Sequence, residues 1–187
     1  MQIAIFGGSF DPIHVAHVTI VQEALKNLDI DMLVIVPTYL NPFKSRFYLN
    51  PQTRFKLIQK VFSKFEKVQI CDYEINQQKT SYSIDTVNYL KSIYKPSKIY
   101  LIIGEDNLKN LEKWHEIDIL KNLVEFVIAT RKGFKTKKAK EFKNLDVDID
   151  ISSSSLRDKI DFNYIPIEIK NDILNLKEKD KSFWILD

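Results

Sequence analysis

Near its beginning the chain carries an apolar run, two glycines and an amphipathic helical pattern in direct succession. Residues 3–6 are uniformly apolar, which is typical of a buried strand. After the glycines, apolar residues recur at spacings of three and four and predict one face of a helix, formed by Val18, Val21, Leu25 and Leu28. Gly7 and Gly8 allow a tight turn in which the backbone approaches a ligand closely. The unit is therefore a strand, a turn and a helix whose first N–H groups favour an anion.

Two histidines stand where this helix is predicted to begin. His14 and His17 are three residues apart, so on a helix their rings share a face. Two imidazoles beside an anion-favouring helix end predict a site that grips a polyphosphate, although the pair alone is also typical of polar surface residues. A zinc site needs three or four ligands, and the sequence adds only His115 and the thiol of Cys71. We therefore expect no metal site made of protein side chains.

Strand-like apolar runs continue along the chain, with helix-like patterns between most of them. They cover residues 3–6, 32–36, 68–71, 99–103, 124–129 and, with alternating polarity, 147–151. Asn50 and Pro51 predict the N-cap and first residue of one helix, and Ser83 predicts the cap of another. The alternation predicts a Rossmann-like α/β fold, with a mostly parallel sheet and helices on both faces. We expect one domain over residues 1–187, ending in a small C-terminal helical extension at 151–187.

Ligands of such sheets bind beyond the carboxyl ends of the strands, so polar and glycine-rich segments should follow the strands. They do so at residues 7–8, 37–44, 72–83, 104–106 and 131–133. Lys44, on the second of these loops, is a candidate phosphate clamp. Gly104 and Asp106 follow the fourth strand, and a carboxylate there can accept hydrogen bonds from ribose hydroxyls. Trp114, shortly beyond, is compatible with a core position or with a ligand contact.

Composition restricts the class of protein further. The chain has 187 residues, of which 44% are hydrophobic, and no apolar run approaches the roughly 20 residues that span a bilayer. A single cysteine excludes an internal disulfide, so we expect a cytoplasmic protein with no membrane partner. The net charge of +3 is too small to indicate nucleic acid, and the basic residues of 131–143 are typical of a solvated surface segment. The apolar residues 183–186 predict a contact with the rest of the chain or with another subunit of a homo-oligomer.

Two segments far apart in the sequence resemble the motifs of one enzyme superfamily. Residues 7–17, GGSFDPIHVAH, resemble the GxFDPxHxGH signature of the HxGH nucleotidyltransferases, with Ala16 in place of a glycine. Residues 151–157, ISSSSLR, resemble their second motif, ISSTxxR, with Ser154 in place of threonine. These enzymes move a nucleoside monophosphate from a nucleoside triphosphate to a phosphate or alcohol acceptor.

This resemblance implies roles for individual residues. His17 is implied to contact the α-phosphate of ATP, His14 the phosphate chain, and Arg157 the β- and γ-phosphates. With Lys44, these residues form the set implied to be catalytic. The wider ATP site is implied to contain Gly7, Gly8, Ser9, Phe10, Gly104, Asp106, Ser152 and Ser153.

Other segments resemble the branch of the superfamily that acts on nicotinate mononucleotide. They are residues 41–44 (NPFK, where the branch has PPHK), 81–86 (SYSIDT, for SYTxxT) and the pattern from Gly104 to Trp114. The resemblance implies that the helix start at Tyr82 and Ser83 receives the carboxylate of the substrate. It also implies that Trp114 stacks on the pyridine ring and that the backbone N–H of His115 binds the carboxylate. Phe43 departs from the branch, because it removes an imidazole that contacts phosphate.

The reaction implied is adenylyl transfer from ATP to nicotinate mononucleotide, giving nicotinate adenine dinucleotide and pyrophosphate, a step of NAD biosynthesis. It needs Mg²⁺ that arrives with ATP and no tightly bound cofactor. We expect direct in-line attack without a covalent intermediate, since the acceptor phosphate is already ionised. One alternative is the same chemistry on nicotinamide mononucleotide or phosphopantetheine. Another is a non-catalytic nucleotide- or RNA-binding module, with residues 131–143 as its main surface.

Overall fold

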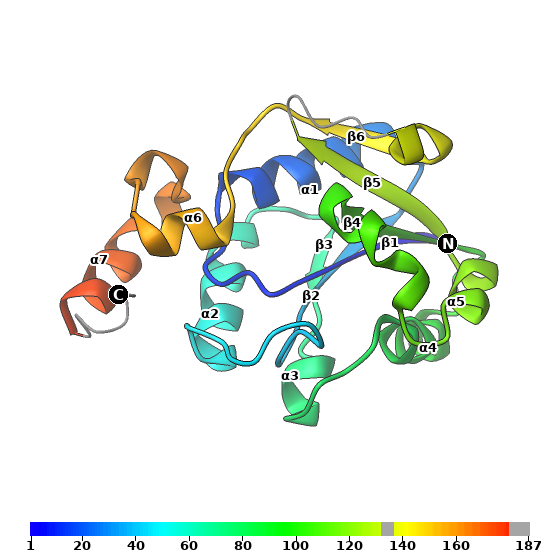
Figure 1. Ribbon diagram of the computed structural model, residues 1–187, viewed down its shortest axis with the longest axis horizontal. Helices are drawn as coiled ribbons and strands as arrows, with labels where there is room; N and C mark the ends of the chain where they lie inside the picture. The colour runs from blue at the N-terminus through cyan, green and yellow to red at the C-terminus, as the bar shows by residue number, and fades with distance from the viewer. Residues whose placement is uncertain (132–136, 180–187) are drawn as a thin grey trace.

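The fold is built on one parallel sheet. The computed structural model describes residues 1–131 and 137–179, so the predicted apolar segment 183–186 and part of the basic stretch 131–143 lie outside the described residues. Six strands are hydrogen-bonded in the order β3-β2-β1-β4-β5-β6, all parallel (Figure 1). Their bounds are β1 Gln2–Gly8, β2 Met32–Pro37, β3 Val68–Ile70, β4 Lys98–Gly104, β5 Glu125–Arg131 and β6 Lys143–Val147. The predicted Rossmann-like class is confirmed.

Helices follow the strands, as the alternation predicts. The α-helices are α1 Val15–Asn27, α2 Pro51–Phe62, α3 Tyr73–Gln77, α4 Ser83–Tyr94, α5 Ile117–Leu123, α6 Ser153–Asp158 and α7 Lys170–Lys179. Short 3-10 turns are η1 Glu105–Lys109, η2 Leu111–Lys113, η3 Lys137–Glu141, η4 Phe162–Tyr164 and η5 Ile167–Ile169. None of the helices described is long and apolar enough to cross a membrane.

The two faces of the sheet carry separate cores, because side chains of a strand alternate between faces. Ala4 and Phe6 of β1 pack in the same buried cluster as residues of α1, α2 and the C-terminal helices. Ile3 and Ile5 pack in the other cluster, with residues of α4 and α5. The predicted arrangement of helices on both faces is therefore confirmed.

Helix α2 begins as its sequence predicts. The side-chain oxygen of Asn50 accepts a hydrogen bond from the N–H of Thr53 at 2.8 Å, and Pro51 is the first helical residue. Helix α4 begins one residue earlier than predicted for a Ser83 cap. Tyr82 is the N-cap and Ser83 lies inside the helix, because the Asp85 carboxylate accepts the N–H of Tyr82 at 3.2 Å.

The last strand also differs from its prediction. The alternating pattern predicted a strand at 147–151, whereas β6 ends at Val147. Among the described residues, the ladder between β5 and β6 ends with the pair Arg131 and Val147. Ile151 is still buried, but in the core that the C-terminal helices share with α1 and α2.

The C-terminal extension packs on α2. Pro166 opens the predicted last helix, whose first turn is η5 and whose remainder is α7. Ile169 and Ile173 are fully buried in the α2 core, and Lys60 of α2 pairs with Asp172 at 2.7 Å. This places α6 and α7 beside α2 at one end of the molecule (Figure 1).

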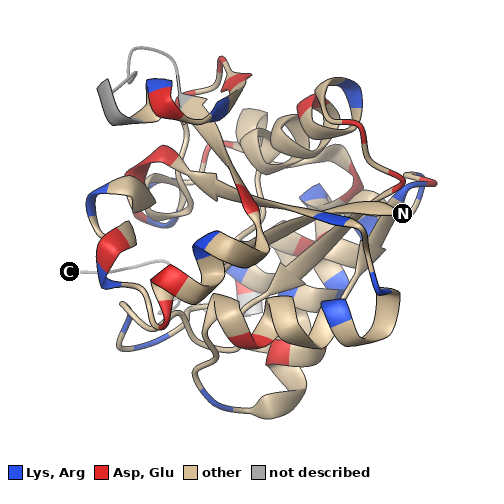
Figure 2. Cartoon of the chain, turned by 90° about the vertical axis from the view of Figure 1, so that its right-hand side faces the viewer, with Lys and Arg blue, Asp and Glu red and all other residues tan. Residues whose placement is uncertain are grey.

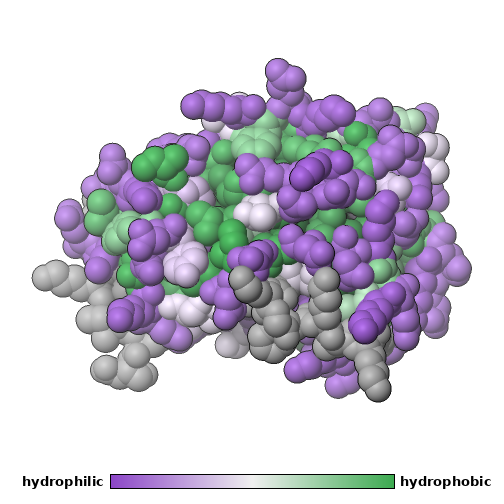
Figure 3. Space-filling model, turned by 90° about the horizontal axis from the view of Figure 1, so that it is seen from above, coloured by the Kyte–Doolittle hydropathy of each residue, from purple (hydrophilic) through white to green (hydrophobic). Residues whose placement is uncertain are grey.

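The outer surface mixes charges and carries hydrophobic side chains between hydrophilic ones. Positions of Lys and Arg and positions of Asp and Glu are interspersed along the ribbon of the described residues (Figure 2). Seen from above, hydrophilic side chains outline the molecule and hydrophobic atoms show between them towards the centre (Figure 3).

Candidate active site

The strand order reverses at β1, which lies between β2 and β4, and ligands of open parallel sheets bind at such a point. Gly7 and Gly8 end β1, and Gly104 ends β4. A cleft of about 690 Å³ opens beyond these carboxyl ends. Every site residue predicted from the sequence lines this cleft except Arg157.

The two histidines meet at the start of α1. His14 is the N-cap residue, and its backbone N–H donates to Nδ1 of His17 at 3.2 Å. Their rings stack with centroids 3.7 Å apart and an interplanar angle of 28°. Because Nδ1 of His17 accepts, neutral His17 carries its proton on Nε2 and is a donor there. The predicted shared face is confirmed.

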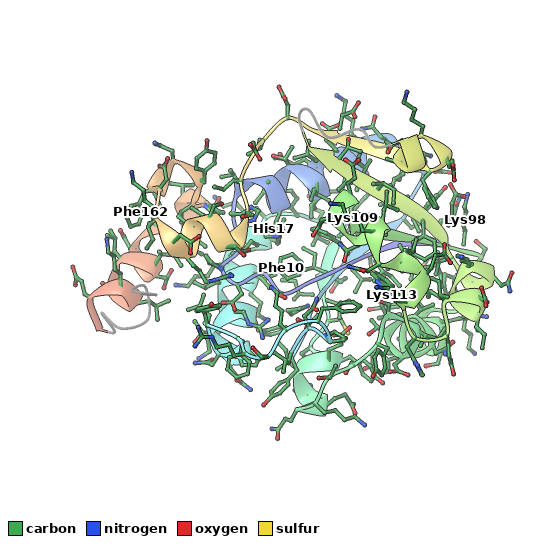
Figure 4. All side chains as sticks on the ribbon, in the orientation of Figure 1. Phe10, His17, Lys98, Lys109, Lys113 and Phe162 are labelled. Carbon is green, nitrogen blue, oxygen red and sulfur yellow. The ribbon has the colours of Figure 1, made fainter. Side chains whose placement is uncertain are left out.

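The glycine turn is held by Phe10. Its ring lies 4.9 Å from the ring of His17, and the two side chains lie side by side at the centre of the molecule (Figure 4). A Cβ at Gly8 would lie 3.1 Å from the Phe10 ring, whereas one at Gly7 would meet only a carbonyl oxygen, 3.9 Å away. A methyl group at position 8 would therefore require the Phe10 ring to shift by a few tenths of an ångström. Ala16, which replaces the family glycine, is buried and lines the cleft.

The N-terminus of helix α6 lies beside the loop that precedes α1. Ser152 is its N-cap, and its Oγ accepts the N–H of Ser155 at 3.0 Å. The hydroxyl of Ser153 donates to the carbonyl of Pro12 at 2.9 Å, which ties this helix to the loop before α1. Two helix N-termini, about 140 residues apart in the sequence, therefore open onto one cleft.

Arg157 lies outside the lining of that cleft. It is buried, and its guanidinium donates to the carbonyl of Asp11 at 2.6 Å and to Oγ of Ser154 at 2.9 Å. The same group stacks over the ring of Tyr48 at 4.2 Å. The structure thus places Arg157 behind the cleft wall, supporting the loop between β1 and α1, and not among the lining residues.

Lys44 connects the second loop to the glycine turn. Its Nζ donates to Oγ of Ser9 at 3.2 Å, so an ammonium group stands at the cleft beside the helix entrance. Partial burial lowers the pKa of Lys44, and the nearby charge of Arg157 lowers the pKa further, while Asp11 opposes both. A bound anion would relieve this repulsion between cations.

Arg54 is a structural residue of the site that the sequence analysis missed. It is the largest fully buried side chain among the described residues. It donates to four backbone carbonyls at 2.6–3.0 Å, those of Ser9, Thr38, Tyr39 and Leu49. Asp11 also holds the loop between β2 and α2, because its carboxylate accepts hydrogen bonds from the N–H groups of Tyr48 and Leu49 at 2.8 Å. The available signal was an arginine on the buried stripe of α2, four residues before Ile58.

The far end of the cleft is aromatic. Tyr82, the N-cap of α4, lies with its ring 4.5 Å from the ring of His115. Trp114 follows η2 and packs partly against the α4–α5 core, and its buried Nε1 has no hydrogen-bond partner in the part of the chain that the structure describes. Lys113 also lines the cleft, and it lies to the lower right of His17 in Figure 4, away from the two histidines.

At the fourth strand, Gly104 and Asp106 form a compact turn. A Cβ at Gly104 would lie 2.5 Å from Oδ1 of Asp106, so the carboxylate folds back over the strand end. Both residues line the cleft.

Glu74 is a second group that the sequence did not reveal. This residue of α3 is buried yet lines the cleft, and its Oε1 accepts a hydrogen bond from the hydroxyl of Thr86 at 2.6 Å. Burial raises the pKa of Glu74 to about 7. The hydrogen bond from Thr86 lowers this pKa, and the charge of Asp85 raises it further.

A parallel sheet with two helix N-termini, stacked imidazoles and a lysine around one cleft defines a nucleotide-binding enzyme of the nucleotidyltransferase class. The sequence model of the cytidylyltransferase-like family matches residues 5–159. The chain belongs to this family and, within it, to the nicotinate-nucleotide adenylyltransferases, as its relatives show.

One such relative, from Aliarcobacter butzleri and named probable nicotinate-nucleotide adenylyltransferase, is 64% identical over 182 residues, which are 97% of this chain and 100% of that protein. A protein of the same name from Nitratiruptor is 48% identical over 93% of this chain and 97% of its own length. A solved structure of Plasmodium falciparum nicotinic acid mononucleotide adenylyltransferase complexed with NaAD shares the fold, with a TM-score of 0.76, 24% identity, and coverage of 94% of this chain and 96% of that one. The family predicted from the sequence motifs is confirmed.

Proposed function

We propose that this protein transfers the adenylyl group of ATP to the phosphate of nicotinate mononucleotide, releasing pyrophosphate and nicotinate adenine dinucleotide for NAD biosynthesis. The observation that carries this proposal is that one cleft has two chemically different ends. Two helix N-termini and His17 occupy one end, and Trp114 and Tyr82 occupy the other. A dinucleotide with a phosphate bridge and a flat aromatic head has this same division.

The chemistry needs little acid or base help. A phosphate oxygen of the mononucleotide attacks the α-phosphorus of ATP, and the bond from that phosphorus to the bridging oxygen of pyrophosphate breaks. The attacking oxygen is ionised near neutral pH, and pyrophosphate leaves readily as an anion. The barrier therefore lies in bringing anions together in line and in stabilising charge on the α-phosphate.

The phosphate end supplies donors and cations for this task. We assign Nε2 of His17 to the α-phosphate, where charge develops, and His14 to the phosphate chain. Lys44 offsets the charge of both substrates from the opposite loop, supported by its position at Ser9. N–H groups at the starts of α1 and α6 receive the remaining phosphate oxygens. Arg157 contributes its positive charge from behind the wall and holds the Asp11 carbonyl in place.

The aromatic end is suited to a pyridine carboxylate. The N–H groups of Ser83 and Ile84, at the start of α4, have no partner within the helix and can receive the carboxylate. The ring of Trp114 can stack on the pyridine, and Tyr82 and His115 close the same end of the cleft. The opposite turn, at Gly104 and Asp106, is assigned to the ribose of ATP.

Mg²⁺ is assigned to ATP, not to the protein. Among the residues that the structure describes, no group of three His, Cys, Asp or Glu side chains could hold a metal ion. The ion would enter on the phosphate oxygens of ATP, which is its usual mode with nucleotides, and would neutralise charge on them. We also propose a cytoplasmic location, on the ground that one cysteine allows no internal disulfide.

The experiment is a comparison of acceptors. Purified protein is given Mg-ATP with nicotinate mononucleotide, nicotinamide mononucleotide or phosphopantetheine, and pyrophosphate release is measured with each. We expect the highest kcat/KM with nicotinate mononucleotide. A higher value with phosphopantetheine, or no pyrophosphate with any acceptor, would contradict the proposal.

A further inference from the structure

A buried carboxyl group stands in a cleft whose substrates are all anions. Glu74 has 5% of its surface exposed and lines the cleft together with Ser81, Tyr82 and Ser83. Cations and N–H donors attract these anionic substrates, whereas an ionised buried carboxylate would repel them. A buried acid is compatible with the site when it carries its proton. The proposed mechanism leaves this residue without a task.

The contacts of Glu74 place it at the pyridine end. Its Oε1 accepts from the hydroxyl of Thr86 at 2.6 Å, and Thr86 belongs to the first turns of α4. The N–H groups of that same helix start are the ones assigned to the substrate carboxylate. Ser81 is buried just before α4, and its Oγ has no hydrogen-bond partner among the described residues. It is a second polar group at the pyridine end of the cleft.

Apart from the hydroxyl of Thr86, the groups that interact with Glu74 do not favour its ionised form. Asp85, on α4, faces it as a carboxylate that holds the N–H of Tyr82. Tyr73, its neighbour on α3, and Cys71, just after β3, are the other titratable groups that interact with it. None of these three is a cation, and burial is the largest effect on the Glu74 carboxyl.

We propose that Glu74 is a specificity-determining residue that links recognition of the pyridine acid to a proton: its neutral carboxyl admits the carboxylate of nicotinate mononucleotide, and its ionised form repels that carboxylate. This inference rests on the proposed function. Two carboxylates that share a buried site cannot both ionise without a large cost. Binding of nicotinate mononucleotide therefore takes up a proton from solvent onto Glu74, and the proton leaves with the product. Nicotinamide mononucleotide carries an uncharged amide, so its binding needs no such proton.

The test measures kcat/KM for the two mononucleotides from pH 6 to pH 8. Both carry the same ribose phosphate, so their ratio cancels the ionisation of that phosphate, of ATP and of the histidines. The neutral fraction of a group with a pKa of about 7 falls about tenfold over this range, so the acid-to-amide ratio should fall about tenfold. Glu74→Gln, which still accepts from Thr86, should remove the pH dependence of the ratio.

Two further variants move the effect in opposite directions. Thr86→Val removes the hydrogen bond that favours ionised Glu74, so the fall in the ratio should shift to higher pH. Asp85→Asn removes a repelling charge while it keeps an acceptor for Tyr82, so the fall should shift to lower pH. A merely structural role for Glu74 would produce neither shift, and these variants keep the test valid should Glu74→Gln fold poorly.

Calorimetry in two buffers of different ionisation enthalpy supplies an independent readout. At pH 8 the wild-type protein should take up about one proton per nicotinate mononucleotide bound and none for the amide. A ratio independent of pH in the wild type, with equal proton uptake for both ligands, would overturn the inference while leaving adenylyl transfer intact. Failure of the proposed function itself would show differently, as no pyrophosphate from nicotinate mononucleotide at any pH.

Discussion

His17 receives the backbone N–H of His14 on its Nδ1, at 3.2 Å, and the two rings stack. The contact leaves Nε2 as the donor nitrogen of neutral His17, and this is the atom that we assign to the α-phosphate. A backbone group of the helix cap thereby sets the chemistry of a side chain one turn later.

Replacement of His17 tests this donor. His17→Ala should lower kcat by roughly 10²–10³-fold, as expected when one donor to a developing charge is lost. Stopped-flow measurement of pyrophosphate release checks the value. Lys26→Ala, an exposed change on the same helix, is the matched control and should keep wild-type turnover. Near-wild-type turnover in His17→Ala would refute the assigned role.

Arg54 should be important for stability as well as for the loop geometry. Arg54→Lys keeps the charge but cannot reach four carbonyls with one ammonium group, so it should cost at least about 2 kcal/mol of unfolding free energy. Urea denaturation of the ligand-free protein measures this. Arg46→Lys, an exposed change on the loop before α2, should stay within about 0.5 kcal/mol of wild type. Equal effects in the two variants would show that the buried contacts of Arg54 contribute little.

The two glycines of the turn should differ in their tolerance of a methyl group. The Phe10 ring that a Cβ at Gly8 would meet is confined by Phe6 at 5.4 Å and His17 at 4.9 Å, so it cannot give way easily. Gly8→Ala should therefore destabilise the ligand-free protein by about 1–3 kcal/mol. The methyl group of Gly7→Ala would make only an ordinary van der Waals contact, so this variant should change stability by less than about 1 kcal/mol. Thermal unfolding of the two variants measures both changes in stability. A larger loss in Gly7→Ala than in Gly8→Ala would be incompatible with this packing.

Glu74 should make the protein less stable as pH rises. Its pKa is about 7 in the folded protein against an ordinary value of 4.5, so the folded state binds the proton more tightly. The stabilisation is complete below the ordinary value and is lost as pH rises through about 7. Glu74→Gln should therefore lose less stability than wild type between pH 4.5 and pH 8, by up to about 3 kcal/mol.

Urea titrations at several pH values measure that difference. Glu178→Gln, an exposed acid of α7, is the control and should follow the wild-type curve. A Glu74→Gln curve parallel to wild type would mean that Glu74 titrates normally in the folded protein.

Local patterns in the sequence were sufficient for the fold and for most of the cleft. A strand followed by glycines and a capped helix specifies its own turn, so Gly8, His14 and Ser152 are placed as predicted. The end of β6 could not be predicted in this way, because the extent of a strand depends on its pairing with β5 and not on its own alternating pattern.

The positions of three charged groups depend on contacts between distant segments. Arg157 does not line the cleft, and its guanidinium contacts the Asp11 carbonyl and the Tyr48 ring, both more than 100 residues earlier in the chain. Arg54 and Glu74 become buried only when the loops after β1 and β2, and the first turns of α4, close around them. No spacing within their own segments encodes these partners.

Direct transfer between two substrates held in one cleft is the central claim, and the stereochemical course at the α-phosphorus tests it most directly. The measurement uses ATP made chiral at the α-phosphorus with oxygen isotopes and sulfur, and determines the configuration of the dinucleotide formed with nicotinate mononucleotide. A single in-line attack predicts inversion. Retention would require two displacements, hence an adenylyl group carried by the protein, and would contradict direct transfer.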